Sequence, residues 1–222
     1  NSRVSDNMSD DDGGGVYLVG ATLLLDNASV ERNTAGDAGG GVGSLSGGVA
    51  VDPSGSGTSG IFADNSAAHF GGAVFGFDSP LSVAGADFVG NSLTVVAGKG
   101  GAISTHGPAG LTITDSILTD NHAPGGDGGA IYNDGDAVDI FDSAFSGNTT
   151  DGFGGALYND GYDFGSPVVG VASIERTTLG PTNAAAGGGA VYNGSLGDLS
   201  IAESLLVGNT ATVEDGGAIW NL

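Results

Sequence analysis

Paired carboxylates are the first groups in this chain that could do chemistry. Asp115 and Asp142 hold equivalent positions in two neighbouring repeats, and glycoside hydrolysis needs two carboxyl groups roughly 5 to 10 Å apart. A polysaccharide lyase would instead need a basic residue beside acidic ones, but Lys99 and Arg176 lie in repeats far from each other. A ladder of polar residues on the outer face of a strand accounts for Asp115 and Asp142 equally well. We therefore predict no catalytic residues and no enzyme; the alternative function is a carbohydrate-active lyase or hydrolase.

A second set of acidic residues suits a calcium ion. Oxygen ligands are crowded into two predicted loops, and hard cations prefer oxygen. The candidate calcium ligands are Asp134, Asp136 and Asp139 in one loop and Asp160 and Asp163 in the other. Solvated carboxylates of turns are the alternative interpretation. The chain has no cysteine and its three histidines show no paired spacing, so we predict neither a zinc site nor any other cofactor.

Aromatic residues form a regular column in the second half of the chain. Tyr132, Tyr158, Tyr192 and Trp220 each stand two residues after the Ala of a Gly-Gly-Ala motif. Because side chains alternate along a strand, these four should face outward. Aromatic faces edged with carboxylates suit sugar rings or a partner surface, so these are the candidate binding residues. The alternative is that the rings stack on one another and stabilise neighbouring strands.

The elements that must position these residues are sequence repeats. A Gly-Gly-Ala motif, represented by Gly128–Asn133, occurs in eight close copies. It alternates strictly with a second motif, in which an apolar residue is followed by two small or polar residues and Asn. We predict that the residue after the Ala position points inward, because it is aliphatic in every copy. These residues are Val16, Val42, Val74, Ile103, Ile131, Leu157, Val191 and Ile219.

The repeat length and the strand pattern together predict the fold. The motif returns every 26 to 34 residues, and each repeat holds three or so short strands in the same order. The segment Leu111–Leu118 alternates apolar and polar residues as a half-buried strand should, and Val138–Phe145 and Leu199–Leu206 are its counterparts. Repeats of this kind stack most simply as coils of a parallel β-helix, where each strand pairs with its copy in the next coil. Almost no helix is predicted, because no window combines a helical apolar stripe with caps.

Glycine and asparagine are predicted to form the corners of the coils. The Gly-Gly pair should lie where the chain turns, because glycine adopts positive φ without a Cβ clash. Asn also tolerates left-handed φ, and stacked Asn amides can hydrogen-bond along the axis as a ladder. Insertions at Pro53–Thr58, Thr94–Lys99 and Asn159–Pro167 lengthen individual coils. Such insertions often build the binding face of a repeat protein.

The charge balance excludes several classes of partner. The 222 residues include 26 acidic and only four basic side chains, which gives a net charge of −22. Such a charge repels phosphate backbones and anionic membrane surfaces, so we predict no binding to nucleic acid. The sequence contains no run of about 18 apolar residues, so no membrane-spanning segment is predicted.

The two motifs together resemble the repeats of the chlamydial polymorphic outer-membrane proteins and related bacterial and archaeal surface proteins. Phe62–Asn65, Phe88–Asn91 and Phe145–Asn148 match the Phe-x-x-Asn pattern in full. The resemblance covers essentially the whole chain, so we expect one domain over residues 1–222. It implies a right-handed, single-stranded parallel β-helix of about seven to eight coils, with an extracellular or cell-surface location. It also implies a structural or adhesive role, with a glycan or the surface of a host or neighbouring cell as the partner.

The ends of the chain suggest how the rod could be extended. Asn1–Val4 aligns with Asp142–Phe145, and Gly216–Asn221 aligns with Gly128–Asn133, so the chain begins and stops in mid-coil. An open end of a β-helix exposes unpaired backbone groups and a cut core. We expect either a longer parent chain or identical rods stacked head to tail into a filament by strand addition.

Overall fold

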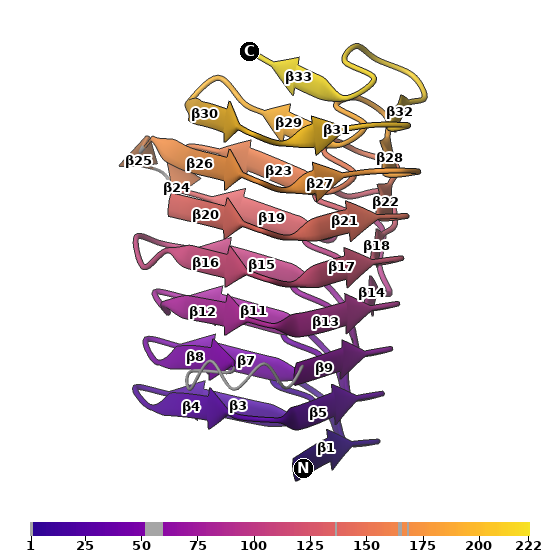
Figure 1. Ribbon diagram of the computed structural model, residues 1–222. Coiled ribbons are helices and arrows are strands. Elements are labelled where there is room, and N and C mark those ends of the chain that lie inside the picture. Colours follow the sequence, from indigo (N-terminus) through magenta and orange to yellow (C-terminus); the bar gives the residue numbers. More distant parts are fainter. Residues whose placement is uncertain (1, 52–59, 136, 164–165, 168) are drawn as a thin grey trace.

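The chain winds into a stack of similar coils. The computed structural model describes residues 2–51, 60–135, 137–163, 166–167 and 169–222, and their regular structure is all β with no helix. Figure 1 shows the coils stacked along one axis, with the N-terminus at one end and the C-terminus at the other. Each strand of a coil pairs in parallel with its counterpart one coil along, giving sheets of seven or eight strands. The predicted parallel β-helix of about eight coils is confirmed, and its right hand stays a prediction.

Four parallel sheets run the length of the rod, and they are named here in the order in which a coil passes through them. The first sheet contains β1 (Ser2–Ser5), β5 (Ala28–Glu31), β9 (Gly60–Ala63), β13 (Ala86–Val89), β17 (Ile117–Thr119), β21 (Ala144–Ser146), β27 (Thr178–Leu179) and β31 (Leu205–Leu206). The second sheet contains the two-residue strands β2 (Met8–Ser9), β6 (Thr34–Ala35), β10 (Ser66–Ala67), β14 (Ser92–Leu93), β18 (His122–Ala123), β22 (Thr149–Thr150), β28 (Ala184–Ala185) and β32 (Thr210–Ala211).

The third and fourth sheets carry the longer strands. The third sheet contains β3 (Val16–Val19), β7 (Val42–Leu45), β11 (Val74–Phe77), β15 (Ile103–His106), β19 (Ile131–Asp134), β23 (Leu157–Asp160), β29 (Val191–Asn193) and β33 (Ile219–Asn221). The fourth sheet contains β4 (Thr22–Leu25), β8 (Gly48–Val51), β12 (Leu81–Ala84), β16 (Leu111–Thr114), β20 (Ala137–Phe141), β26 (Gly170–Glu175) and β30 (Gly197–Ala202).

A coil has four strands rather than three or so, because segments predicted as one strand are bent. Leu111–Leu118 is divided between β16 and β17 at Asp115, whose φ is 49°. Its two counterparts are bent in the same way at Asp142 (φ 50°) and Glu203 (φ 49°). A left-handed residue ends the extended conformation and turns the chain into the next sheet. The strands of the second sheet were missed because two residues are too short to show alternation.

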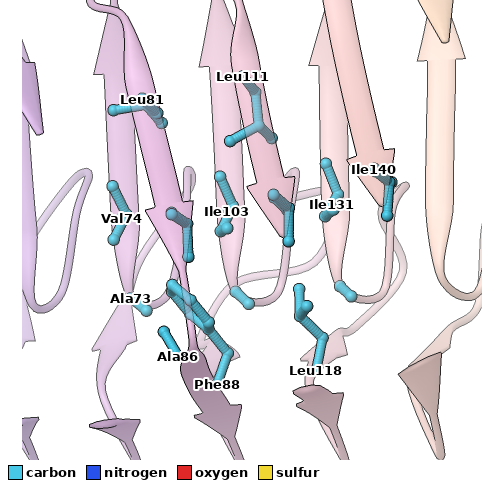
Figure 2. Close-up of a cluster of buried hydrophobic side chains, with 14 of the residues drawn as sticks. Ala73, Val74, Leu81, Ala86, Phe88, Ile103, Leu111, Leu118, Ile131 and Ile140 are labelled. Carbon is cyan, nitrogen blue, oxygen red and sulfur yellow. The ribbon is translucent and has the colours of Figure 1, made fainter. Parts of the chain in front are cut away.

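The core lies inside the coil and is continuous along the rod. Figure 2 shows aliphatic side chains of the third and fourth sheets, among them Ile103, Ile131 and Leu111, pointing toward the larger side chains of the first sheet. Of those larger side chains, Phe62 and Phe88 are fully buried and stack with ring centroids 4.5 Å apart. The aliphatic series predicted to point inward is buried in the interior coils, and its end members, Val16 and Ile219, pack against the same core. The predicted inward positions are therefore confirmed.

The two glycines of each Gly-Gly pair are required for different reasons. The first has positive φ in all eight copies, as Gly128 does at 66°, which confirms the predicted corner. The second lies against the next coil: a Cβ on Gly129 would be 2.3 Å from the carbonyl oxygen of Gly155. The second glycine therefore allows the corners of adjacent coils to approach closely.

The Asn of the second motif forms the predicted axial ladder. Asn121 is buried; its Nδ2 donates to Asn148 Oδ1 (2.9 Å) and to Phe88 O (3.0 Å), and its Oδ1 accepts from Asn91 Nδ2 (3.0 Å). The expected left-handed conformation of these Asn residues is wrong. It belongs to the residue before each of them, such as Asp120 with φ 55°. That residue makes the turn, and the Asn amide then points inward to satisfy the corner carbonyls.

Insertions leave the regular coil at the expected places. Asn159–Pro167 contains the antiparallel pair of β24 (Tyr162–Asp163) and β25 (Ser166–Pro167), which projects from the side of the rod in Figure 1. Thr94–Lys99 follows β14 and leads to a bridge between Lys99 and Asp127. The Pro53–Thr58 insertion lies outside the described residues. Within the described part of the chain, no helix is long and apolar enough to cross a membrane.

Candidate functional site

Most of the side chains that could bind a ligand or take part in a reaction lie on the outer face of the third sheet. Parallel register places Ser104, Tyr132 and Tyr158 in one column and His106, Asp134 and Asp160 in another. A third column forms at the residue before each Gly-Gly pair. In this column β-bridges join Phe70 to Lys99 and Lys99 to Asp127, and further along the rod a β-bridge joins Phe153 to Gly187. We call the part of this surface between Lys99 and Trp220 the aromatic face.

The four candidate binding residues form one continuous ring stack. The rings of Tyr132 and Tyr158 are 4.8 Å apart and within 9° of parallel, and those of Tyr158 and Tyr192 are 5.0 Å apart at 14°. Trp220 meets Tyr192 edge to face at 5.5 Å. Only 3% of Tyr132 and 9% of Tyr192 is exposed. The residues point away from the core, as predicted, but their ring faces cover one another, which favours the alternative that the rings stabilise neighbouring coils.

Other rings extend the stack at both ends. Phe153 lies 4.9 Å from Tyr192 and 5.3 Å from Trp220 between ring centroids. On the other side His106 lies 5.6 Å from Tyr132 and 5.2 Å from Phe70. These members of the stack were not predicted from the sequence, although an alignment of the residues before each Gly-Gly pair places Phe70 and Phe153 beside the tyrosine column.

Lys99 is bound to Tyr132 of the next coil. Its Nζ donates to the Tyr132 hydroxyl at 2.5 Å and lies 4.3 Å from the ring centroid. Asp127, the bridge partner of Lys99, accepts the Phe153 backbone N–H at 2.9 Å. Burial raises the pKa of Asp127, although the Phe153 N–H and the Lys99 charge act in the opposite direction. The one lysine of the chain is thus held between the tyrosine column and an acidic group.

Ser104, His106 and Asp134 form a row of polar side chains across two neighbouring strands. Ser104 Oγ is 3.1 Å from His106 Nε2, and His106 Nδ1 is 3.5 Å from Asp134 Oδ2. This order of groups is that of an acyl-transfer triad, and it was not predicted from the sequence. A nucleophile must reach its substrate, however, and Ser104 is completely buried. The three residues therefore act as a polar network that fixes the outer face of β15 against β19.

Tyr158 and Asp160 form a second polar pair at the centre of the aromatic face. The Tyr158 hydroxyl donates to Asp160 Oδ2 at 3.2 Å, while Asp160 Oδ1 accepts the Gly161 backbone N–H at 2.7 Å. Burial, followed by the neighbouring Tyr132 and Asp160, raises the pKa of Tyr158 far above its usual value. Burial likewise raises the pKa of Tyr132, with Asp134 adding to it. Both phenols therefore keep their protons at neutral pH.

The candidate calcium ligands whose side chains are described lie on two different sheets. Asp134 and Asp160 are register partners on the third sheet, whereas Asp139 lies on β20 in the fourth. Asp136 lies outside the described residues, and for Asp163 only the backbone is described. Among the described residues, the one set of at least three converging carboxylates and imidazoles is a different one, Asp11, Asp12 and Asp37. Two of these already have partners: Asp12 accepts the Ala38 N–H and Asp37 bonds to His69.

The acidic residues considered for catalysis lie at an exposed corner of the coils, and the basic residues are already bound to other side chains. Asp115 and Asp142 occupy equivalent bends between the fourth and first sheets. Arg176 holds Asp142 through two hydrogen bonds, at 2.8 and 2.9 Å, and also contacts Glu175. Arg176 and Asp142 form a surface ion pair, with more than two fifths of each of these two side chains exposed.

Comparison with known families identifies two adjacent coils. Residues 115–134 and 142–160 each match the Chlamydia polymorphic membrane protein repeat. The matched segments carry the Asn and Gly-Gly motifs together with Tyr132 and Tyr158, so the resemblance is confirmed for these coils. No curated protein and no solved structure matches the chain.

Proposed function

We propose that this chain forms the rod of a cell-surface protein and acts there as a structural and adhesive element. The observation that carries the proposal is the match of two adjacent coils to the Chlamydia polymorphic membrane protein repeat. Stacked coils support it, because a solenoid extends along one axis and presents a long surface to a partner. The extracellular location and the adhesive role are inferred from this combination of repeat and shape.

We propose a glycan of a neighbouring cell surface as the ligand class. The faces of Tyr132, Tyr158 and Tyr192 are taken up by one another, so a ligand would meet ring edges, hydroxyl groups and carboxylates. Trp220 and Asp160 are both half-buried, so an indole and, two coils away on the third sheet, a carboxylate remain partly exposed. Indole rings suit the C–H faces of a sugar, and carboxylates accept hydrogen bonds from its hydroxyl groups.

A structural role is favoured over the carbohydrate-active enzyme by the state of the basic groups. Lys99 is hydrogen-bonded to Tyr132 and Arg176 to Asp142. A lyase base must be available to take a proton from its substrate. Neither residue stands free beside a set of acidic groups, so the aromatic face supports binding better than proton abstraction.

Two measurements test the proposal. An antibody against the chain should label intact producing cells, and labelling only after permeabilisation would overturn the surface location. The purified chain should bind one class of glycan on an array, and Trp220→Ala should weaken that binding about tenfold, as loss of an aromatic anchor does. Ile117→Ser, an exposed position on the first sheet, is the matched control and should bind normally. An equal loss of glycan affinity in both variants would show that the aromatic face is not the binding site. Release of cleaved glycan would favour the enzyme.

A further inference from the structure

The ring stack offers a path for an electron vacancy along the rod. Four rings from successive coils follow one another with centroid separations of 4.8, 5.0 and 5.5 Å. Phenol and indole rings are readily oxidised by one electron, and contact between π systems allows a vacancy to move from ring to ring. Trp220, which ends the series, and Tyr158 are both half-buried, so an outside oxidant can meet the stack at either ring.

The composition directs oxidation to these rings. The chain has no cysteine and a single methionine, so thiol and thioether groups do not compete along most of the rod. That methionine, Met8, lies on β2, the first strand of the second sheet, whereas Trp220 lies on β33, the last strand of the third sheet, at the opposite end of the rod. In the C-terminal half the stacked tyrosines and Trp220 are therefore the most oxidisable side chains that the structure describes.

The hydroxyl partners distinguish Tyr158 from Tyr132. A tyrosine that loses an electron also loses its phenolic proton, so it needs a proton acceptor. Tyr132 faces the ammonium group of Lys99, which has no lone pair to accept a proton and whose charge opposes a positive vacancy. Tyr158 instead donates to Asp160 Oδ2, and the other oxygen of that carboxylate is held by the Gly161 N–H. The acceptor is thus already aligned at Tyr158.

We propose that Tyr158 is a redox-active tyrosine, oxidised when a strong one-electron oxidant takes an electron from the ring stack. The Tyr158 O–H bond breaks, its proton forms a new O–H bond with Asp160 Oδ2, and its electron reduces the oxidant. The products are a neutral tyrosyl radical, a neutral Asp160 carboxylic acid and the reduced oxidant. An external one-electron reductant such as ascorbate supplies an electron to the ring, the proton returns from Asp160 to the phenol, and the starting pair is restored.

The test uses a photogenerated tris(bipyridine)ruthenium(III) complex as the oxidant. The two other tyrosines, Tyr17 and Tyr162, are replaced by Phe in every sample, so that only the stack can give a tyrosyl radical. After illumination and rapid freezing, electron paramagnetic resonance measures the radical. Tyr158→Phe keeps the ring and should abolish most of the tyrosyl signal, whereas Tyr132→Phe is the matched control and should preserve it.

The Asp160→Asn variant tests the proton acceptor directly. The Asn side-chain oxygen can still accept the Gly161 N–H, but it cannot take up the proton, so the tyrosyl yield should fall about tenfold, the scale of losing one hydrogen bond to a charged group. Formation of the radical should also be slower in deuterium oxide, because a proton moves with the electron. Undiminished radical in a folded Asp160→Asn, or in a folded Tyr158→Phe, would overturn the proposal.

Discussion

The ring of Tyr132 lies flat against that of Tyr158, with centroids 4.8 Å apart and planes within 9° of parallel. The two residues belong to consecutive coils, and their strands pair residue for residue. The same contact is repeated from Tyr158 to Tyr192. A row of outward-facing side chains therefore joins coils in addition to the backbone ladder and the inner core.

Removing the ring of Tyr158 should destabilise the rod. Tyr158→Ala deletes a ring with stacked partners on both sides, and we expect it to lower the free energy of unfolding by about 2 kcal/mol or more. Tyr158→Phe keeps the ring, loses one hydroxyl hydrogen bond and should cost about 1 kcal/mol at most. Urea denaturation followed by circular dichroism measures both. Equal losses in the two variants would show that the hydroxyl matters more than the ring.

A methyl group on the second glycine of a corner should force two coils apart. The Cβ of Gly129→Ala would lie 2.3 Å from Gly155 O, so we expect a loss of about 3 kcal/mol or failure to fold. Gly20→Ala is the control, because a Cβ there meets no atom within 4 Å and the cost comes only from a φ of 62°. That cost should be about 1 kcal/mol. A larger loss at Gly20 than at Gly129 would contradict the close-approach argument.

The Asn ladder should be most sensitive in its middle. Asn121→Ala removes the partner of Phe88 O and of two neighbouring Asn amides, all of them buried. Buried groups left without partners should cost about 3 kcal/mol in total. Asn7→Ala at the exposed end of the same ladder should cost less than about 1 kcal/mol, because water replaces the lost contacts there. Thermal melting of both variants decides whether burial sets the difference.

Asp127 should make the stability of the rod depend on pH in an unusual direction. Burial raises its folded pKa above the ordinary 3.8, so the fold prefers the protonated acid. That preference contributes stability below the ordinary pKa, and the contribution is lost as pH rises through the folded pKa. Asp127→Asn imitates the neutral acid at every pH. The variant should melt like the parent at about pH 3 and at a higher temperature at neutral pH.

Asp142 provides the control with the opposite sign. The Arg176 guanidinium holds the pKa of the Asp142 carboxyl below its usual value. Its contribution to stability is therefore present at neutral pH and is lost as pH falls through the lowered folded pKa. Asp142→Asn should melt below the parent at neutral pH and approach it in acid. If both variants shifted in the same direction, the opposed causes assigned to the two carboxyl groups would be wrong.

The fold could be predicted from the sequence because each repeat pairs with the repeats directly before and after it in the chain. The aliphatic residue that follows each Gly-Gly-Ala motif marks the core, and the Asn that ends each copy of the other motif marks one corner. Neither inference needs any knowledge of contacts between distant residues. The bends at Asp115, Asp142 and Glu203 were not accessible. Asp is enriched at positive φ, but it also occurs at many other positions of this acidic chain, so its presence did not mark the bend.

Only part of the chemistry of the aromatic face could be predicted from the sequence. Tyr132, Tyr158, Tyr192 and Trp220 could be aligned because they share one motif position. Lys99 has no basic neighbour in its own or the adjacent repeat, and its partner is Tyr132, a residue one coil away. Contacts in a β-helix join residues about one repeat apart, so columns of aligned positions predict partners better than neighbours in sequence do.

The residue-for-residue register between coils has a consequence for the length of the rod. Every interior coil presents the same ladders and a similar core to the coil on either side. An in-frame duplication or deletion of one whole repeat would therefore join two surfaces that already fit, without creating a new kind of interface. Unequal recombination within such a gene can change the reach of the protein in steps of one coil while each remaining coil keeps its structure.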